Sequence, residues 1–497
     1  MSGTRIRHAL TRLPAQSRRH FRTDDIRCKI RRMRCNQCIL PHPFLDTAGY
    51  HSPEAAMSPL IHHISSDETL PTSSDVVIIG GGIVGASAAY FLARRGLSVA
   101  LVEKGYVGCE QSSRNWGWCR RQNRDERELP LANLALRLWE ELTVEIGHDL
   151  GFRRCGLLYA TADPKQLGEW ERWREVARRF DVNTRMLTAS EAAAAVPAAG
   201  GRKWLGGVRA ADDGKAEPWL AAPRIAEGAR KHGATIHQNC AARGLDITNG
   251  QVSGVVTEKG FIRTSRVLCA AGAWASAFLR MHAVSLPQAS VRQTALRTGP
   301  APDFGGAIYT SDCALTRRID GSYTIAVSGR ATLELTPQSI RYARPFLPMF
   351  LKRRKAVEIG IGRSFFQGPE TLGRWRFDKP TPFERIRVLD PAPDIRMTAT
   401  IMARIRALLP AVAEAGVVSA WGGYVDSTPD AIPAISPVDS IGGVFVAAGC
   451  SGHGFGAGPG IGHLAADLVA GDTAIVDPTP FRLSRFRDRS KIEVGAI

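Results

Sequence analysis

One short segment constrains the fold of this chain more than any other. Between Asp75 and Gly105 the sequence passes from a short apolar run through a glycine-rich turn into a helical pattern that ends at Gly96, and then into a second apolar run. This order is typical of a strand–helix–strand unit with buried strands. We therefore expect an α/β domain built around this unit.

The turn of this unit has the spacing of a dinucleotide-binding fingerprint. Gly80, Gly82 and Gly85 stand in the order G-x-G-x-x-G. In such turns the first glycine permits a tight bend, the second lets the backbone approach a pyrophosphate at the positive end of the helix, and the third lets helix and strand touch. Glu103 ends the second strand about 20 residues further on, where its carboxylate can accept hydrogen bonds from ribose hydroxyls. The acid favours a ribose without a 2′-phosphate, but it does not separate FAD from NAD.

Beyond this unit the chain alternates helical and strand-like patterns. A sheet-rich insertion is expected from about Pro287 to Arg406, because alternating apolar and polar residues there suit an antiparallel sheet. Helices are expected over 218–232, 337–353 and 459–470, and strands over 235–238 and 252–257.

The positive charge of the chain is concentrated in part at one end. The net charge is +18 over 497 residues, and residues 1–56 hold eleven Arg and Lys against four Asp and Glu. Because this segment lacks sustained periodicity, we expect a basic, disordered extension. It resembles either an organelle transit peptide or an upstream extension of a protein that begins at Met57, and we favour the second. Elsewhere the basic residues form no run, so no nucleic-acid partner is expected, whereas peripheral membrane contact remains open.

The cysteines indicate a reducing compartment, and the apolar stretches bear on whether the chain spans a membrane. Ten cysteines are scattered singly, without the framework of a disulfide-stapled domain, so a reducing, cytoplasmic location is expected. Cys28, Cys35, Cys38 and His42 are spaced wrongly for a compact zinc finger, and no metal is expected. The longest apolar stretch, 76–102, contains five glycines and two arginines, so we interpret it as part of the nucleotide-binding unit and not as a membrane span.

Three further segments resemble one family of flavoproteins. They are QSSRNWGWCRR at 111–121, VLCAAGAWAS at 267–276, and the stretch 421–471 with its glycine-rich turn GCSGHGFGAGPG. Together with the fingerprint, they make residues 75–486 similar to the D-amino-acid oxidase superfamily, in the branch that holds glycine oxidase, sarcosine oxidase and D-amino-acid dehydrogenase.

This resemblance implies a fold class and a division of the chain. The implied fold is an α/β FAD-binding Rossmann-like domain with an interleaved α+β substrate domain built on a largely antiparallel sheet. The FAD-binding domain is expected to comprise 72–150, 215–286 and 407–475, and the substrate domain 151–214 and 287–406.

The resemblance also implies a noncovalent FAD and the residues that hold it. The glycine-rich turn lets backbone lie against the isoalloxazine ring, and the helix that begins near Pro459 directs its positive end at flavin N1 and the C2 carbonyl. Noncovalent binding is implied because Gly422 and Gly423 stand where sarcosine oxidase attaches its flavin to a cysteine. The residues expected to contact FAD are Gly80, Gly82, Ile83, Val84, Gly85, Glu103, Lys104, Ser112, Ser113, Arg114, Ala241, Ala242, Ala271, Gly272, Trp274, Gly449, Gly452, His453, Gly454, Phe455 and Gly456.

The reaction implied by the resemblance is oxidation of a C–N bond in an amino acid or secondary amine. A hydride passes from the carbon next to the nitrogen to flavin N5, and the imine product hydrolyses. The implied catalytic residues are Arg121, where the family holds its substrate carboxylate, Tyr424, which matches a pocket tyrosine, and His453 among the flavin-facing glycines. Trp116 and Trp118 form either an apolar wall or part of the core.

Two departures from sarcosine oxidase leave the substrate and the electron acceptor open. Gly456 stands where that enzyme has a substrate-binding lysine, and no equivalent of its oxygen-activating lysine is identified. A dehydrogenase that passes electrons to a quinone or an electron-transfer partner is therefore favoured over an oxidase that uses O2. Two alternatives remain: a flavin-binding subunit of a hetero-oligomeric amine or opine oxidase, and an RNA-modifying flavoprotein.

Overall fold

The computed structural model describes residues 59–197 and 201–495. All of them belong to one structural unit, Ser52–Ile497. The extension expected over residues 1–56, with its group of cysteines and a histidine, lies outside the described residues. No helix in the two described ranges is both long and apolar enough to cross a lipid bilayer.

A six-stranded sheet forms the central layer around the fingerprint. Its strands are β1 Val76–Ile79, β2 Val99–Val102, β8 Thr235–His237, β12 Val267–Cys269, β20 Ala434–Pro437 and β21 Val444–Ala448. They follow the order β20-β21-β12-β1-β2-β8, and every neighbouring pair is parallel except β20 and β21. Both faces of β1 and β2 are buried, which explains why each strand reads as an unbroken apolar run.

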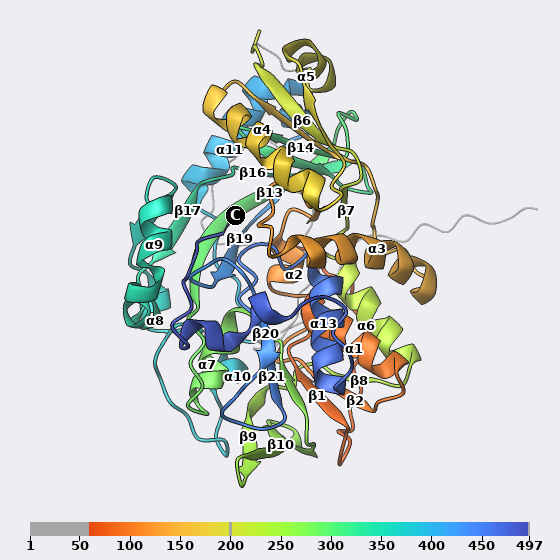
Figure 1. The fold of residues 1–497 in the computed structure, drawn as a ribbon, viewed down its shortest axis with the longest axis vertical. Helices are drawn as coiled ribbons and strands as arrows, with labels where there is room; N and C mark the ends of the chain where they lie inside the picture. The colour runs from red at the N-terminus through yellow and green to blue at the C-terminus, as the bar shows by residue number, and fades with distance from the viewer. Residues whose placement is uncertain (1–58, 198–200, 496–497) are drawn as a thin grey trace, which may run out of the picture. The chain divides into compact units, whose positions relative to one another are not determined.

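Helices cover one face of this sheet. They are α1 Ile83–Arg94, α3 Leu129–Ile146, α6 Ala221–Lys231 and α13 Gly458–Ala470. α1 packs between α6 and α13, as Figure 1 shows. The approach of α13 to α1 depends on two glycines, because a Cβ at Gly462 would lie 2.4 Å from Cβ of Ser87 and one at Gly458 would lie 2.6 Å from Cγ1 of Ile83.

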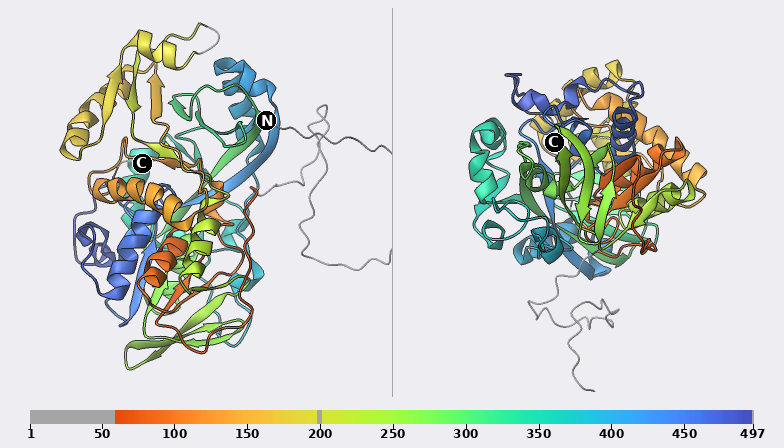
Figure 2. Two further views of the ribbon diagram at one scale, coloured as in Figure 1. Left: turned by 90° about the vertical axis from the view of Figure 1, so that its right-hand side faces the viewer. Right: turned by 90° about the horizontal axis from the view of Figure 1, so that it is seen from below.

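A small antiparallel sheet and a short helix cover the opposite face. They are β9 Ala242–Thr248, β10 Gln251–Thr257, β11 Gly260–Arg263 and α7 Ala275–Arg280. Val77 and Ile79 of β1 point into the core on this side, whereas Val76 and Ile78 point towards the helices. The right-hand view of Figure 2 looks onto these green strands from below.

A ten-stranded mixed sheet forms the second large layer. Its strands are β4 Leu157–Thr161, β5 Thr184–Leu187, β6 Gly206–Ala210, β13 Ala289–Pro300, β14 Ala307–Thr310, β15 Ala314–Arg317, β16 Ser322–Ala326, β17 Ala331–Glu334, β18 Val357–Gly360 and β19 Val417–Ser427. The order is β18-β17-β13-β16-β15-β14-β4-β6-β5, with β19 also paired to β13. The pairs β14–β4 and β17–β18 are parallel and the others are antiparallel.

Helices on this layer bury its apolar face. Ile401, Ile405 and Leu408 pack against Leu296 and Ile325 of the sheet in one core cluster. These helices are α4 Pro164–Arg179, α5 Ala189–Ala195, α11 Ile395–Leu408 and α12 Pro410–Glu414. Three more helices belong to the sheet-rich insertion: α8 Pro337–Arg341, α9 Ala343–Arg353, which has no buried residue, and α10 Pro382–Arg385, whose Phe383 packs in the core beside the six-stranded sheet. Short elements join the two layers: α2 Gln111–Arg114, β3 Trp118–Cys119 paired with β7 Gly214–Lys215, and η1 Gly272–Trp274.

The elements expected from the sequence occur with small shifts. The expected helices over 218–232 and 459–470 correspond to α6 and α13, and the helix over 337–353 is divided at Tyr342 into α8 and α9. β19 lies inside the segment expected for the FAD-binding domain, but it pairs with β13 of the ten-stranded sheet along most of its length.

Candidate functional site

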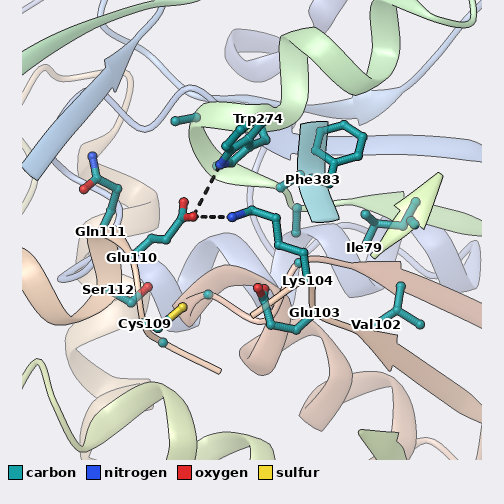
Figure 3. A pocket seen from close by; sticks show the side chains of 18 of the residues that line it. Ile79, Val102, Glu103, Lys104, Cys109, Glu110, Gln111, Ser112, Trp274 and Phe383 are labelled. Carbon is teal, nitrogen blue, oxygen red and sulfur yellow. Dashed lines mark hydrogen bonds and ion pairs between the residues drawn. The ribbon is translucent and has the colours of Figure 1, made fainter. Parts of the chain in front are cut away.

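A groove lies at the carboxyl ends of β1, β2 and β12, where the fingerprint turn meets two other loops (Figure 3). Gly80 has a φ of +107°, and a Cβ there would lie 2.5 Å from the carbonyl oxygen of Ala270. A Cβ at Gly85 would lie 2.0 Å from the carbonyl oxygen of Gly80. Glycine is therefore required at both positions, and it allows α1 to lie directly on the turn.

The N-terminus of α1 opens into this groove. Its N-cap residue is Gly82, which has no side chain of its own to cap the helix. Ile83 N donates a hydrogen bond to Ser112 Oγ at 2.9 Å, and a Cβ at Gly82 would lie 3.3 Å from the same oxygen. The positive end of a twelve-residue helix is thus left accessible to an anion such as a pyrophosphate.

Glu103 braces the fingerprint turn from the end of β2. Its Oε2 accepts a hydrogen bond from Gly81 N at 2.8 Å, and its Oε1 accepts one from Gly105 N at 2.7 Å. Burial raises the pKa of this carboxyl group. The side chain lines the groove at the position where the fingerprint requires a ribose-binding acid.

A lysine, a glutamate and a tryptophan converge on the wall of the groove, as Figure 3 shows. Lys104 Nζ and Trp274 Nε1 both donate to Glu110 Oε1, the second at 3.3 Å. The ammonium group also lies 4.8 Å from the centre of the Trp274 ring, which is within the range of a cation–π contact. These three side chains fix the distance between the loop after β2 and the loop after β12.

Nine of the expected cofactor residues line the groove: Gly80, Gly82, Glu103, Lys104, Ser112, Ala242, Ala271, Gly272 and Trp274. Other expected residues lie beside it. Arg114 is buried and donates to the carbonyl of Gly422 at 3.2 Å, and Ala241 N donates to Glu258 Oε1 at 2.6 Å. Lining residues that the sequence did not suggest include Cys109, Glu110, Gln111, Phe278 and Phe383.

A segment from the sheet-rich insertion lies against the wall of the groove, and we call residues Phe383–Asp390 the strap. Lys104 Nζ donates to the carbonyls of Ile386 and Arg387 at 2.9 and 3.0 Å. Leu389 N donates to Glu110 Oε1 at 2.9 Å. The strap is therefore held by the same lysine and glutamate that line the groove.

Ion pairs hold the strap on both sides. Arg387 forms a double ion pair with Glu258, with 2.5 Å between Nη2 and Oε2, and its Nη1 donates to the carbonyl of Lys104 at 3.0 Å. Arg114 Nη1 lies 2.6 Å from Asp390 Oδ1. No motif signals this arrangement, because its partners come from distant parts of the chain.

The second glycine-rich turn lies between β21 and α13. Gly449, Ser451 and Gly452 all have positive φ, at 74°, 52° and 83°. A Cβ at Gly456 would lie 2.4 Å from the carbonyl oxygen of Trp118, so the turn packs directly on β3. Phe455 points into the core against Trp139, with ring centres 5.4 Å apart.

His453 lies in this turn with a buried acidic partner. Its Nδ1 is 2.9 Å from Glu128 Oε2, so Nδ1 carries the proton that the carboxylate accepts. Burial lowers the pKa of His453 to about 4, and the nearby Arg124 and Arg120 contribute. The imidazole is therefore neutral at pH 7. Its Nε2 is buried and has no hydrogen-bond partner among the described residues.

Arg120 and Arg124 place positive charge beside His453. Arg124 is 3% exposed, and burial together with Arg120 lowers its pKa to about 9. Within 59–197 and 201–495, neither guanidinium forms an ion pair with a carboxylate. The neighbouring Glu128 is the partner of His453.

Arg121, the expected carboxylate anchor, lies elsewhere. Its Nε is 3.1 Å from Oδ1 of Asp213, a fully buried acid, and its backbone N donates to Oδ2 at 3.0 Å. Its Nη2 lies 3.5 Å from Asp212. Successive residues of an extended segment point to opposite sides, so Arg121 faces Asp213 while Arg120 faces His453.

The Tyr424 hydroxyl has an acidic partner of its own in the ten-stranded sheet. It donates to Glu334 Oε2 at 2.7 Å, and burial and this carboxylate raise the pKa of the phenol. Trp421 and Gly423 lie on the opposite face of β19 from Tyr424. Trp421 Nε1 donates to the carbonyl of Arg114, and a Cβ at Gly423 would lie 3.4 Å from Arg114 Cβ. The structure brings His453 together with Arg120 and Arg124, whereas Arg121 and Tyr424 are each paired with an acid.

An aromatic cluster lines the other side of β3. The Trp118 ring contacts Trp116, Tyr159 and Tyr309 at centre distances of 5.3, 6.3 and 6.4 Å. Trp118 Nε1 donates to Thr316 Oγ1 at 2.6 Å. Sequence reasoning missed the two tyrosines because they come from β4 and β14, and it missed Arg120 although strand alternation separates it from Arg121.

Comparison with known proteins places this site in a family. The family described as DAO, FAD dependent oxidoreductase, matches residues 75–468. The chain is 26% identical over 426 residues to 4-methylaminobutanoate oxidase (formaldehyde-forming) of Paenarthrobacter nicotinovorans, covering 85% of this chain and 47% of that protein. It is 28% identical over 434 residues to glycine oxidase of Pseudomonas aeruginosa, covering 82% and 98%. The chain thus spans about half the length of the first relative.

A solved structure extends the likeness to three dimensions. L-amino acid deaminase from Proteus myxofaciens, in complex with anthranilate, superimposes with a TM-score of 0.82 at 31% identity, covering 87% of this chain and 98% of that one. The start of α1, the position at Gly82 without a Cβ and the carboxylate of Glu103 fit an FAD. The resemblance seen in the sequence is therefore confirmed, and the chain belongs to the DAO family of FAD-dependent oxidoreductases.

Proposed function

We propose that the chain oxidises an amine that carries a carboxylate, such as an amino acid, at the carbon next to the nitrogen. FAD supplies the hydride acceptor for this reaction. The protein would bind the substrate, orient its C–H bond and exclude water. The substrate loses a hydride and an N–H proton, and the imine then takes up water to give an oxo compound and an amine or ammonia.

The observation that carries this proposal is the pair Arg120 and Arg124. Arg124 is buried and forms no ion pair within the described residues, and Glu128 and Asp213 offset its charge only from a distance. Burial of such a charge is costly, and an anionic partner removes much of that cost. A substrate carboxylate is such a partner, and arginine binds it through two parallel hydrogen bonds. Anthranilate, present in the Proteus deaminase complex, also carries a carboxylate.

The aromatic cluster around Trp118 supports a substrate with an apolar side chain. Trp116, Trp118, Tyr159 and Tyr309 form one connected set of rings next to Arg120. Such a wall gains free energy by covering apolar surface and excludes water from the reacting carbon. Glycine, which has no side chain, would gain nothing from it.

His453 is assigned a hydrogen-bonding role and not that of a base. A pKa of about 4 makes its imidazole a weak proton acceptor at neutral pH. The Nε2 atom is an acceptor, because Nδ1–H is directed at Glu128. It is suited to an N–H group of the substrate or of the flavin.

The decisive experiment is anaerobic flavin bleaching with a panel of amines. We expect bulky apolar amino acids to bleach the flavin faster than glycine, and a polyamine without a carboxylate to bleach it slowly. Equal rates with and without a carboxylate would contradict the proposal. No bleaching with any amine would favour the alternative of a flavin-binding subunit that needs a partner.

A dehydrogenase is proposed over an oxidase, and FAD is proposed to be held without a covalent bond. Turnover with a quinone or dye should exceed turnover with O2, measured as oxygen uptake. Trichloroacetic acid should release the flavin into the supernatant, because Gly422 and Gly423 offer no attachment atom. Flavin retained on the precipitate would overturn the second claim.

A further inference from the structure

A second hollow lies away from the flavin groove, where the end of α7 meets the end of α8, at the lower left of Figure 1. Its volume is about 340 Å³. Three arginines line it: Arg280 ends α7, Arg341 ends α8, and Arg374 lies in the loop before the strap. It shares no lining residue with the flavin groove.

None of these arginines has a carboxylate partner in the part of the chain that the structure describes. Arg280 donates to the carbonyls of Thr371 and Gly373 at 2.8 and 3.4 Å and to Gln338 Oε1 at 3.4 Å, which are all neutral acceptors. Burial lowers the pKa of Arg280, and Arg341 and Arg374 lower it further. Three like charges therefore face one hollow without compensation.

Two hydroxyl groups and an apolar wall complete the hollow. Ser285 Oγ and Tyr342 Oη lie 3.1 Å apart and are both hydrogen-bonding groups. Val284 is buried beneath them. A fourth arginine, Arg487, donates to the carbonyl of Ser285 at 3.1 Å and adds positive charge.

Two arginines from nearby parts of the chain do have carboxylate partners: Arg376 with Asp378 at 2.7 Å and Arg243 with Glu384 at 2.9 Å. What distinguishes Arg280, Arg341 and Arg374 is that all three line one hollow.

We propose that this hollow binds a small phosphate-bearing molecule, such as a phosphomonoester or a diphosphate. Arginine matches the geometry of phosphate oxygens with paired N–H donors, and a phosphate group carries enough charge to balance more than one guanidinium. A volume of about 340 Å³ is in the range of small-ligand sites. The hydroxyls of Ser285 and Tyr342 add donors beside the arginines.

The test is calorimetric titration of the FAD-loaded protein with inorganic pyrophosphate at constant ionic strength. FAD loading is needed because the empty flavin groove itself accepts a pyrophosphate. We expect saturable binding to one site, absent with acetate. The exposed positions allow Arg341→Gln and Arg374→Gln without loss of fold, and each should weaken binding by about tenfold. Absorbance should confirm unchanged flavin content.

Arg376→Gln is the matched control, because Arg376 lies two residues from Arg374 and is paired with Asp378. It should bind pyrophosphate like the unchanged protein. Absence of saturable binding would overturn the proposal. Equal weakening in Arg374→Gln and Arg376→Gln would also overturn it, because it would indicate a general effect of surface charge.

Discussion

Arg120 and Arg121 are neighbours in the chain but stand in different electrostatic surroundings. Arg121 neutralises the buried Asp213, whereas Arg120 lies beside His453 and Arg124. The first pair is internal to the fold, and removal of the arginine would leave a buried charge. The second arginine is available to a ligand. Replacement of Arg120 should therefore change the rate of flavin reduction, and replacement of Arg121 should change the stability of the fold.

Arg120→Gln should lower kcat/KM for flavin reduction by a carboxylated amine by about a hundredfold, because loss of a charge-assisted pair costs about 3 kcal/mol. An amine without a carboxylate should react equally well with both proteins. Anaerobic stopped-flow absorbance measures this. Equal losses for both substrate types would assign Arg120 to the flavin instead.

Arg121→Gln should instead lower the free energy of unfolding, by about 3 kcal/mol or more, since Asp213 would keep its burial and lose its counter-charge. Denaturant unfolding measures the effect. Unchanged stability together with a selective loss of carboxylated substrates would return Arg121 to the role of anchor.

Sequence motifs predict the glycines of the site more reliably than its charged and aromatic side chains. The glycine positions of the fingerprint follow from local backbone geometry, and Gly80 and Gly85 have the close contacts that it requires. Arg121 and Tyr424 lie in extended segments, where a shift of one residue reverses the side on which a side chain lies, and their assignment to the site stays a prediction. A match between the sequences of distant relatives does not show which side chain lies on which side. The pairing of the strands in the structure does show it.

Among the elements, the strap is the one that depends most on distant contacts. It joins the sheet-rich insertion to the loops after β2 and β10 through Lys104, Glu110 and Glu258. Because Lys104 and Glu110 also line the groove, we expect these contacts to hold the wall in place around a bound FAD. The strap is thus expected to set the rate at which the cofactor is lost.

Arg387→Gln should raise the FAD dissociation rate by about tenfold, because it removes the double ion pair with Glu258. The rise of flavin fluorescence after dilution of the loaded protein measures it. Arg385→Gln is the control, since Arg385 donates only to the carbonyl of Pro380 within the described residues. Identical rates in both variants would show that the strap does not retain FAD.

A histidine joins α7 to the small antiparallel sheet and gives a pH dependence. His282 Nε2 accepts a hydrogen bond from Leu245 N at 3.1 Å, so the folded protein holds the imidazole neutral. Burial lowers the pKa of His282 from 6.5 to about 4. Between these values the unfolded chain binds a proton that the folded protein does not, so stability falls as the pH drops through this window.

The loss at pH 4 should be on the order of 3 kcal/mol for this group. His282→Gln offers an amide oxygen to Leu245 N and does not titrate. The decrease in the free energy of unfolding between pH 7 and pH 4 should therefore be smaller in the variant. Parallel pH profiles for the two proteins would contradict the assignment.

At the scale of the whole molecule, the helix-like and strand-like sequence patterns predicted the six-stranded sheet and its helices well and the ten-stranded sheet less well. β1 and β2 are recognisable because a buried parallel strand reads as an apolar run. β19 was expected in the FAD-binding segment, but ten of its eleven residues pair with β13. That pairing joins residues far apart in the chain, and no local pattern encodes it.

Deletion of residues 1–56 should leave the flavin content and the rate of flavin reduction unchanged, because the segment lacks the periodic apolar residues that would place it in a core. Absorbance at the flavin band and stopped-flow reduction measure both. Loss of flavin from the shortened chain would mean that the segment contributes to the fold.

During synthesis, the fingerprint leaves the ribosome long before its sheet can form. β1 lies between β2 and β12, and β12 in turn pairs with β21, which begins only at Val444. At ribosomal speed this interval is on the order of tens of seconds. Throughout it, β12 lacks its partner β21 and the second glycine-rich turn is absent. We therefore expect FAD to meet the complete set of its predicted contacts only near the end of translation.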